Sequence, residues 1–158
     1  MFDNVRKVLN EFGNLLVDTY RDKLTKEKVN ASKTLYNSIS YIVEGDGANF
    51  IVKLKLEDYW RKVEEGTKPK EEWVSTQKLI EWIKIKPVIP RPFANGKLPT
   101  TKHLANLISR KIYFKGIKPR PLLQQSIDDV FDEIKERLEE ALIKDIESEF
   151  EIIKGIMS

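Results

Sequence analysis

The sequence predicts a mixed α+β domain, because two kinds of hydrophobic spacing occupy separate parts of the chain. Near both ends, apolar residues recur every three or four positions, as in amphipathic helices. Between residues 39 and 56 they alternate with polar residues, as in strands that bury one face. The length of 158 residues suits a single domain over residues 1–158 with a core of ordinary size.

The first predicted element is a helix over about residues 3–27, with Asp3 as its expected N-cap. Gly13 interrupts the pattern without breaking it, since a glycine inside a helix costs about 1 kcal/mol relative to alanine. The apolar positions of this helix are Val5, Val8, Leu9, Phe12, Leu15, Leu16, Tyr20 and Leu24.

A β-hairpin follows, with strands at residues 39–44 and 50–56 and a turn at residues 45–48. An isolated hairpin is barely stable in water. We therefore expect this one to lie against the helices and to gain a further strand.

Three shorter helices are predicted in the middle of the chain. The first covers residues 59–65 and ends at Gly66, which permits a left-handed exit. A second begins after Ser75, and a third after Thr100 or Thr101. The expected apolar stripe of the third helix is Leu104, Leu107, Ile108 and Ile112.

Prolines shape the two connections around that third helix. Four of them fall within residues 87–99, which excludes regular helix there and predicts an ordered loop or arm. Pro119 and Pro121 stiffen an extended link at residues 115–121. The last helix then starts near residue 123, and its apolar spacing continues to about residue 153.

Charge is divided along the chain, although the net charge is only +3. Residues 82–127 contain ten Lys and Arg and no acid, whereas residues 128–151 contain eleven acids and three bases. One interpretation is a solvated helix face beside a basic loop. The other is contact between copies, in which the basic segment of one subunit meets the acidic helix of the next; such head-to-tail contacts close into rings when the rotation per subunit allows.

The residues expected at such an interface belong to the proline-rich arm, the basic segment and the acidic helix. They are Arg91, Phe93, Lys97, Arg110, Lys111, Lys115, Lys118, Arg120, Asp128, Asp129, Asp132 and Glu136.

Residues 102–120 also suit a nucleic-acid backbone, because basic side chains stand beside Tyr113 and Phe114. A nucleic-acid-binding accessory protein is therefore the alternative function. The acidic helix argues against general binding of this kind, because its charge lowers the long-range attraction of the whole domain.

The sequence offers little for catalysis. There is no cysteine, and His103 is the single histidine, which excludes thiolate chemistry and multi-histidine metal sites. Phosphate-loop and nucleophile-elbow motifs are absent. The carboxylates of residues 128–136 are better explained as the polar face of a helix than as a cation site. We therefore expect no enzyme activity, no catalytic residue, no metal and no cofactor.

No apolar run is long enough to span a membrane, so no membrane partner is expected.

Three short segments carry a family resemblance. Residues 35–41 read LYNSISY, residues 59–67 read YWRKVEEGT and residues 116–123 read GIKPRPLL. In this order they resemble the phage tail-completion family, the minor neck proteins that join the tail to the capsid–portal complex. Two departures stand out: Leu122 or Leu123 occupies the position where the family usually has Phe, and the connection at residues 87–99 is unusually rich in proline.

The resemblance implies an α+β fold in which the first and last helices pack a small, mainly antiparallel sheet. It also implies a structural virion protein, a head–tail connector whose copies form a homo-oligomeric ring in the neck. Virion assembly would then take place in the host cytoplasm. The implied partners are further copies of the chain, portal or connector proteins and tail proteins, with non-specific contact to DNA passing through the neck. The family brings no catalytic residues.

Overall fold

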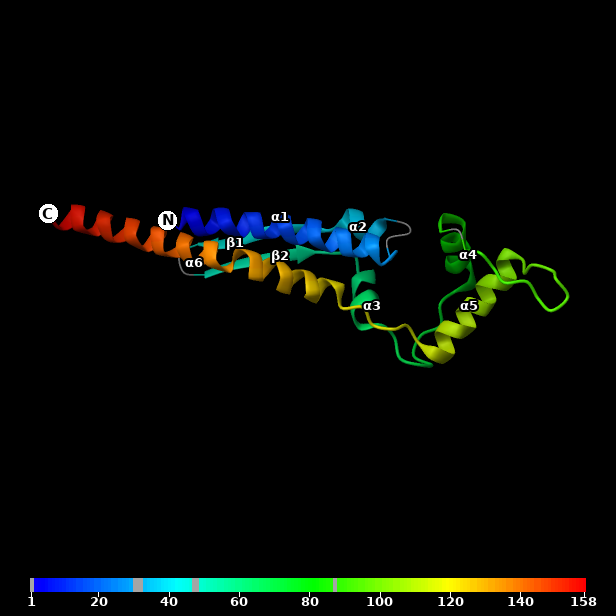
Figure 1. The fold of residues 1–158 in the computed structure, drawn as a ribbon. Helices are drawn as coiled ribbons and strands as arrows, with labels where there is room; N and C mark the ends of the chain where they lie inside the picture. Colours follow the sequence, from blue (N-terminus) through cyan, green and yellow to red (C-terminus); the bar gives the residue numbers. More distant parts are fainter. Residues whose placement is uncertain (1, 30–32, 47–48, 87) are drawn as a thin grey trace.

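The computed structural model describes residues 2–29, 33–46, 49–86 and 88–158, and Figure 1 shows its backbone. It confirms an α+β fold with a small antiparallel sheet and long helices at both ends. Its elements are α1 (Asp3–Lys26), α2 (Thr34–Ser38), β1 (Ser40–Asp46), β2 (Asn49–Lys55), α3 (Tyr59–Glu65), α4 (Thr76–Ile85), α5 (Thr101–Lys115) and α6 (Leu122–Met157).

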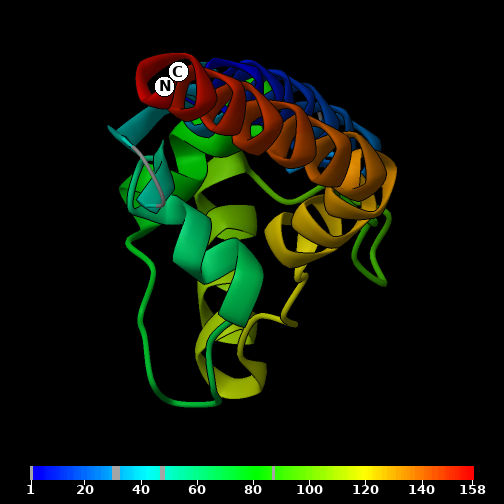
Figure 2. The same ribbon diagram turned by 90° about the vertical axis from the view of Figure 1, so that its left-hand side faces the viewer.

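Helices α1 and α6 lie side by side and antiparallel along the length of the molecule (Figures 1 and 2). Ion pairs between the two helices follow this direction: Lys23 Nζ lies 2.9 Å from Asp129 Oδ2, and Arg137 pairs with Glu11 nearer the start of α1. An apolar cluster fills the space between them. It comprises Val5, Val8, Val130, Ile134 and Ala141.

The start of α1 differs from the prediction. Asp3 is the first residue of the helix, and Phe2 occupies the N-cap position without a side-chain hydrogen bond to the helix. The free N–H groups are instead met by Asp145 of α6. Its Oδ2 accepts from Val5 N at 2.8 Å, and its Oδ1 accepts from Asn4 N at 3.2 Å and from Asn4 Nδ2 at 2.7 Å. The cap of α1 is therefore supplied by a residue about 140 positions away, because the antiparallel pairing places it there.

The hairpin forms with the expected alternation. Strands β1 and β2 pair antiparallel, from Ser40 opposite Lys55 to Asp46 opposite Asn49. The predicted turn residues 47 and 48 lie outside the described residues. Within the described part of the chain the sheet has two strands, so the expected further strand is wrong. Packing on α1 takes its place, since Tyr41 and Leu54 lie against the core residues of that helix.

A second apolar cluster joins the C-terminal half of α1 to the elements that follow it. Its members come from α1, from α2 and the residue after it, from α3 and from the start of α6. They are Val17, Tyr20, Leu24, Leu35, Ile39, Val63, Leu122 and Leu123. This cluster fixes the position of α3 against α1 and α6, and the chain continues from α3 toward α4 and α5.

Helices α4 and α5 form a hairpin that stands apart from the α1–α6 pair, toward one end of an elongated molecule (Figure 1). Both helices begin at the caps predicted from the sequence. Ser75 Oγ accepts a hydrogen bond from Lys78 N at 3.2 Å, and Thr100 Oγ1 accepts one from His103 N at 3.2 Å. Of the two threonines considered for α5, Thr100 is the cap.

Candidate interaction surfaces

In the α4–α5 hairpin, the buried residues that α5 contributes are small. Ala105 and Ser109 are the fully buried residues of α5, and Ser109 Oγ donates to the Val74 carbonyl at 2.6 Å. One turn earlier on α5, Asn106 Oδ1 accepts a hydrogen bond from Thr76 Oγ1 at 2.8 Å. Small side chains let the two helices approach closely, so α5 turns its Ala105 and Ser109 face toward α4.

This orientation corrects the predicted apolar stripe of α5. Leu107 was expected in the core, but 43% of its surface is exposed, and Phe114, two turns further along, is 53% exposed. At 3.6 residues per turn, both lie opposite Ala105 and Ser109. Arg110 and Lys111 are exposed between them. The outward face of α5 therefore combines two large apolar groups with two cations.

The proline-rich connection ends in an ordered turn. Phe93 N donates to the Lys97 carbonyl and Gly96 N to the Phe93 carbonyl, both at 2.9 Å. The Phe93 ring meets His103 of α5 edge to face, with centroids 5.3 Å apart. Arg91, Phe93 and Lys97 are all exposed at this end of the molecule. Pro87, the first predicted residue of the arm, lies outside the described residues.

A short antiparallel bridge joins the α4–α5 hairpin to the body. Thr67 N donates to the Ile117 carbonyl and Ile117 N to the Thr67 carbonyl, each at 3.0 Å. Gly66 and Gly116 flank this bridge at φ of 64° and 74°. A Cβ on Gly66 would lie 2.1 Å from the Ile117 carbonyl oxygen, and one on Gly116 would lie 2.2 Å from that of Thr67. Only glycine fits at either position, since both the backbone angle and the space exclude a side chain.

Glu64, within the second of the three sequence segments, closes the start of α6. Its carboxylate accepts hydrogen bonds from the N–H groups of Leu123 and Gln124, the latter at 3.4 Å. Negative charge at a helix N-terminus is favourable, because the helix dipole is positive there. Burial of the nearby Tyr20 hydroxyl raises the pKa of that group, and the negative charge of Glu64 raises it further. Sequence reasoning missed Glu64 because its partners are about 60 positions away.

Two cations of the basic segment are used inside the chain. Arg120 Nη1 donates to the Glu27 carbonyl at 3.2 Å, and Lys86 Nζ donates to the Lys28 carbonyl at 2.7 Å. These carbonyls follow the last turn of α1, where the helix dipole is negative. Arg120 therefore stabilises the fold as well as standing in the predicted interface, whereas Lys115 and Lys118 are exposed beside it.

The predicted acidic residues all lie on exposed positions of α6. Asp129 pairs with Lys23 of α1, and Asp128 Oδ1 accepts a hydrogen bond from Gln124 Nε2 at 3.0 Å. Asp132 Oδ1 lies 3.8 Å from Lys135 Nζ, a weak contact between groups that are both largely exposed. Asp132 and Glu136 therefore face solvent on the side of α6 away from α1. The structure does not bring this acidic group together with the basic residues of α5 in one chain (Figure 1).

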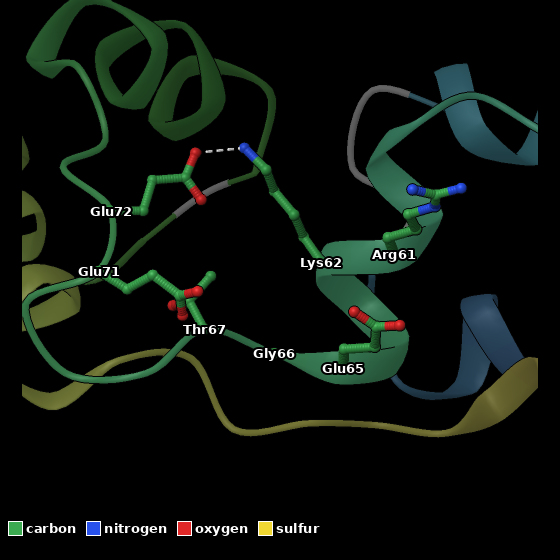
Figure 3. A pocket seen from close by; sticks show the side chains of 7 residues that line it. All are labelled: Arg61, Lys62, Glu65, Gly66, Thr67, Glu71 and Glu72. Atoms are coloured by element: carbon green, nitrogen blue, oxygen red, sulfur yellow. Dashed lines mark hydrogen bonds and ion pairs between the residues drawn. The ribbon is translucent and has the colours of Figure 1, made fainter.

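An open hollow of about 300 Å³ lies between α3 and the residues after it (Figure 3). Lys62 forms an ion pair with Glu72 across it, and Glu71 Oε2 accepts from Lys68 N at 2.6 Å. Charged side chains of both signs line the hollow, and the Lys62–Glu72 pair links α3 to the residues before α4. Its lining residues are Arg61, Lys62, Glu65, Gly66, Thr67, Glu71 and Glu72.

Among the described residues, no three His, Asp or Glu side chains are placed to hold a metal ion together. In the same part of the chain, no helix combines the length and apolar character needed to cross a membrane. Comparison with known proteins gives no match to a family model, to a curated protein or to a solved structure.

Proposed function

We propose that this chain is a structural protein of the phage neck, several copies of which form a ring between the capsid–portal complex and the tail. The observation that carries the proposal is the separation of charge in space. The basic residues of the acid-free segment 82–127 belong to α4, α5 and the connections beside them. These helices lie at one end of the molecule, while the acidic helix α6 runs toward the other end (Figure 1). A subunit that joins its neighbours head to tail needs two such unlike surfaces.

The three segments that resemble the tail-completion family also meet in space, which supports the proposal. Leu35 and Ile39 from the first segment, Val63 from the second and Leu122 and Leu123 from the third pack in one apolar cluster. The second and third segments are joined further by the Thr67–Ile117 bridge and by the cap that Glu64 provides. The three segments, which are far apart in the sequence, thus pack together in one part of the fold.

The proposed partners on either side of the ring are portal or connector proteins and tail proteins. The arm with Arg91, Phe93 and Lys97 is the proposed contact with an adjacent ring, because it presents an aromatic group and two cations on an exposed turn. The DNA passing through the neck would meet the cations of α5 only through weak, sequence-independent contacts.

Native mass measurement tests this function, with the purified chain alone and after mixing with tail-less heads of the phage that encodes it. We expect a fixed number of copies on each portal vertex, and loss of tail joining when Arg91 and Phe93 are both changed to alanine. Ala94→Ser is the matched control, since it changes a neighbouring exposed residue of the same turn. Absence of the protein from mature particles would contradict the ring. Normal tail joining by the double variant would contradict the arm contact.

A further inference from the structure

The second half of α6 exposes a continuous apolar stripe. Its members follow one another at alternating intervals of three and four residues, which is the spacing of a coiled-coil seam. They are Ile143 (55% exposed), Ile146 (39%), Phe150 (60%), Ile153 (49%) and Met157 (82%). At 3.6 residues per turn this stripe lies opposite Ile134 and Ala141, which pack on α1. We call these five residues the tip stripe.

The end of α6 projects beyond the helix that supports it. Asp145 already contacts the first turn of α1, so residues 146–157 continue for about 18 Å past that point (Figure 1). Four of these twelve residues are isoleucine and one is Gly155, which are moderate or poor helix formers. A packing partner on the tip stripe would therefore stabilise a segment whose own helix propensity is modest.

Charge selects the kind of surface that fits this stripe. Within its own length the tip stripe is flanked by Glu147 and Glu149, one on each side. Asp132, Glu136 and Glu139 continue the same outward face before Ile143, and the whole helix contains eleven acids against four bases. A second α6 would bring like charges together, which is unfavourable. A surface that combines apolar and basic groups would cover the apolar stripe and also attract the acidic side chains beside it.

The outward face of α5 has this composition. Leu107 and Phe114 are exposed on it, with Arg110 and Lys111 between them, and α5 contains four bases and no acid. Its fifteen residues span about 22 Å, which equals the length of α6 from residue 143 to residue 157. The two surfaces lie at opposite ends of the elongated molecule, so one chain cannot join them to each other (Figure 1).

We propose that the tip stripe of one copy docks on the outward face of α5 in a second copy. This inference rests on the self-assembly in the proposed function and names the surfaces that carry it. The contact is head to tail, so each copy uses its α6 end toward one neighbour and its α5 face toward the other. It builds an open chain of subunits or, where the rotation closes, a ring.

Two chains disabled at opposite surfaces test the proposal. The tip variant carries Phe150→Asp and Ile153→Asp, and the α5 variant carries Leu107→Asp and Phe114→Asp. All four positions are exposed, so circular dichroism is expected to show folded protein in each case. In sedimentation velocity, the wild type should self-associate, each variant alone should be monomeric, and an equimolar mixture should form one-to-one dimers. The mixture associates because one chain keeps an intact stripe and the other an intact α5 face.

Other results would overturn the contact. Dimers of the α5 variant alone would mean that tip stripes pair with each other, and dimers of the tip variant alone would mean that α5 faces pair. A mixture that stays monomeric, or a wild type that does not associate, would also reject it. Ile152→Asp is the control for the tip variant: Ile152 is adjacent to Ile153 and similarly exposed, but it lies outside the stripe. The control should associate like the wild type.

Cross-linking checks the geometry separately, because the natural chain contains no cysteine. A chain with Ile153→Cys mixed with one carrying Leu107→Cys should form a mixed disulfide on oxidation, and Ile152→Cys should form much less. These experiments distinguish failure of the proposed contact from failure of the proposed function. If the variants assemble on phage heads as the wild type does, the contact is wrong and the neck function stands. If the wild type associates by this contact but never binds heads, the neck function is wrong and the contact stands.

Discussion

Gly13 of α1 illustrates how one residue is explained only by its neighbour in space. In the sequence it is an interruption of a helical pattern. In the fold, the ring of Tyr41 lies directly on it, and a Cβ built there would be 2.3 Å from Tyr41 Cδ2. The Tyr41 hydroxyl also donates to the Asn10 carbonyl at 2.9 Å, which holds the ring in place. The absent side chain is thus what lets β1 approach α1.

We predict that Gly13→Ala lowers the free energy of unfolding, although alanine is the better helix former. The added methyl group meets a fixed ring, and overpacking of this kind costs about 1–3 kcal/mol. Gly155→Ala in α6 is the matched control, because nothing lies within 4 Å of the position that its Cβ would take. That control should be neutral or stabilising by up to about 1 kcal/mol. Thermal unfolding of the two variants measures the difference, and equal effects would reject the steric explanation.

At the scale of elements, the ends of the two long helices are held by carboxylates from other elements. Asp145 of α6 meets the start of α1, and Glu64 of α3 meets the start of α6. Asp145 is only 5% exposed. Burial by itself raises its pKa, but hydrogen bonds from Val5 N and from Asn4 outweigh burial, and the pKa lies below its ordinary value of 3.8.

This pKa shift predicts the sign of a pH effect. Because the folded chain holds the carboxylate ionised, Asp145 contributes its full stabilisation above the ordinary pKa of 3.8 and loses it as the pH falls through the lower folded pKa. Asp145→Asn should cost about 1 kcal/mol near pH 7, the usual worth of a capping side chain. Denaturant unfolding between neutral and acidic pH should show a smaller loss of stability in this variant than in the wild type. Asp132→Asn, at an exposed position, should keep the wild-type pH dependence.

At the scale of the whole molecule, some charged residues form ion pairs within the chain, and others form the surfaces proposed to meet between copies. Lys23, Asp129, Arg137 and Glu11 link α1 to α6 at partly exposed positions. Such surface pairs are worth about 0.2–1 kcal/mol each, so apolar packing dominates the stability of the single chain. The proposed contact between copies differs, because it brings together a basic and an acidic surface that are separate in one chain.

Salt should therefore separate folding from association. Raising the salt from about 0.05 M to about 0.5 M shortens the range of charge interactions to a few ångströms. We expect the unfolding midpoint of a monomeric variant to change little and the association of the wild type to weaken strongly. Sedimentation and thermal unfolding in the same buffers measure both quantities. Association that is insensitive to salt would show that apolar contact alone carries it.

The sequence by itself was enough for the local elements. The limits of α3, the caps at Ser75 and Thr100, the β-hairpin and the long last helix all follow from spacing and capping chemistry, which act between neighbours in the chain. The division of charge that underlies the candidate interface was visible in the same way. The resemblance to the tail-completion family remains a hypothesis drawn from the sequence.

Only the tertiary structure decided which face of each helix is covered. Periodicity identifies residues that share a face, but it does not say what packs on that face. Leu107 is therefore exposed where Ala105 and Ser109 are buried, and α1 packs on the hairpin where a third strand was expected. Asp145 and Glu64 became helix caps for the same reason. Their partners are distant in the chain and close in space, and the spacing of neighbouring residues does not predict such a long-range contact.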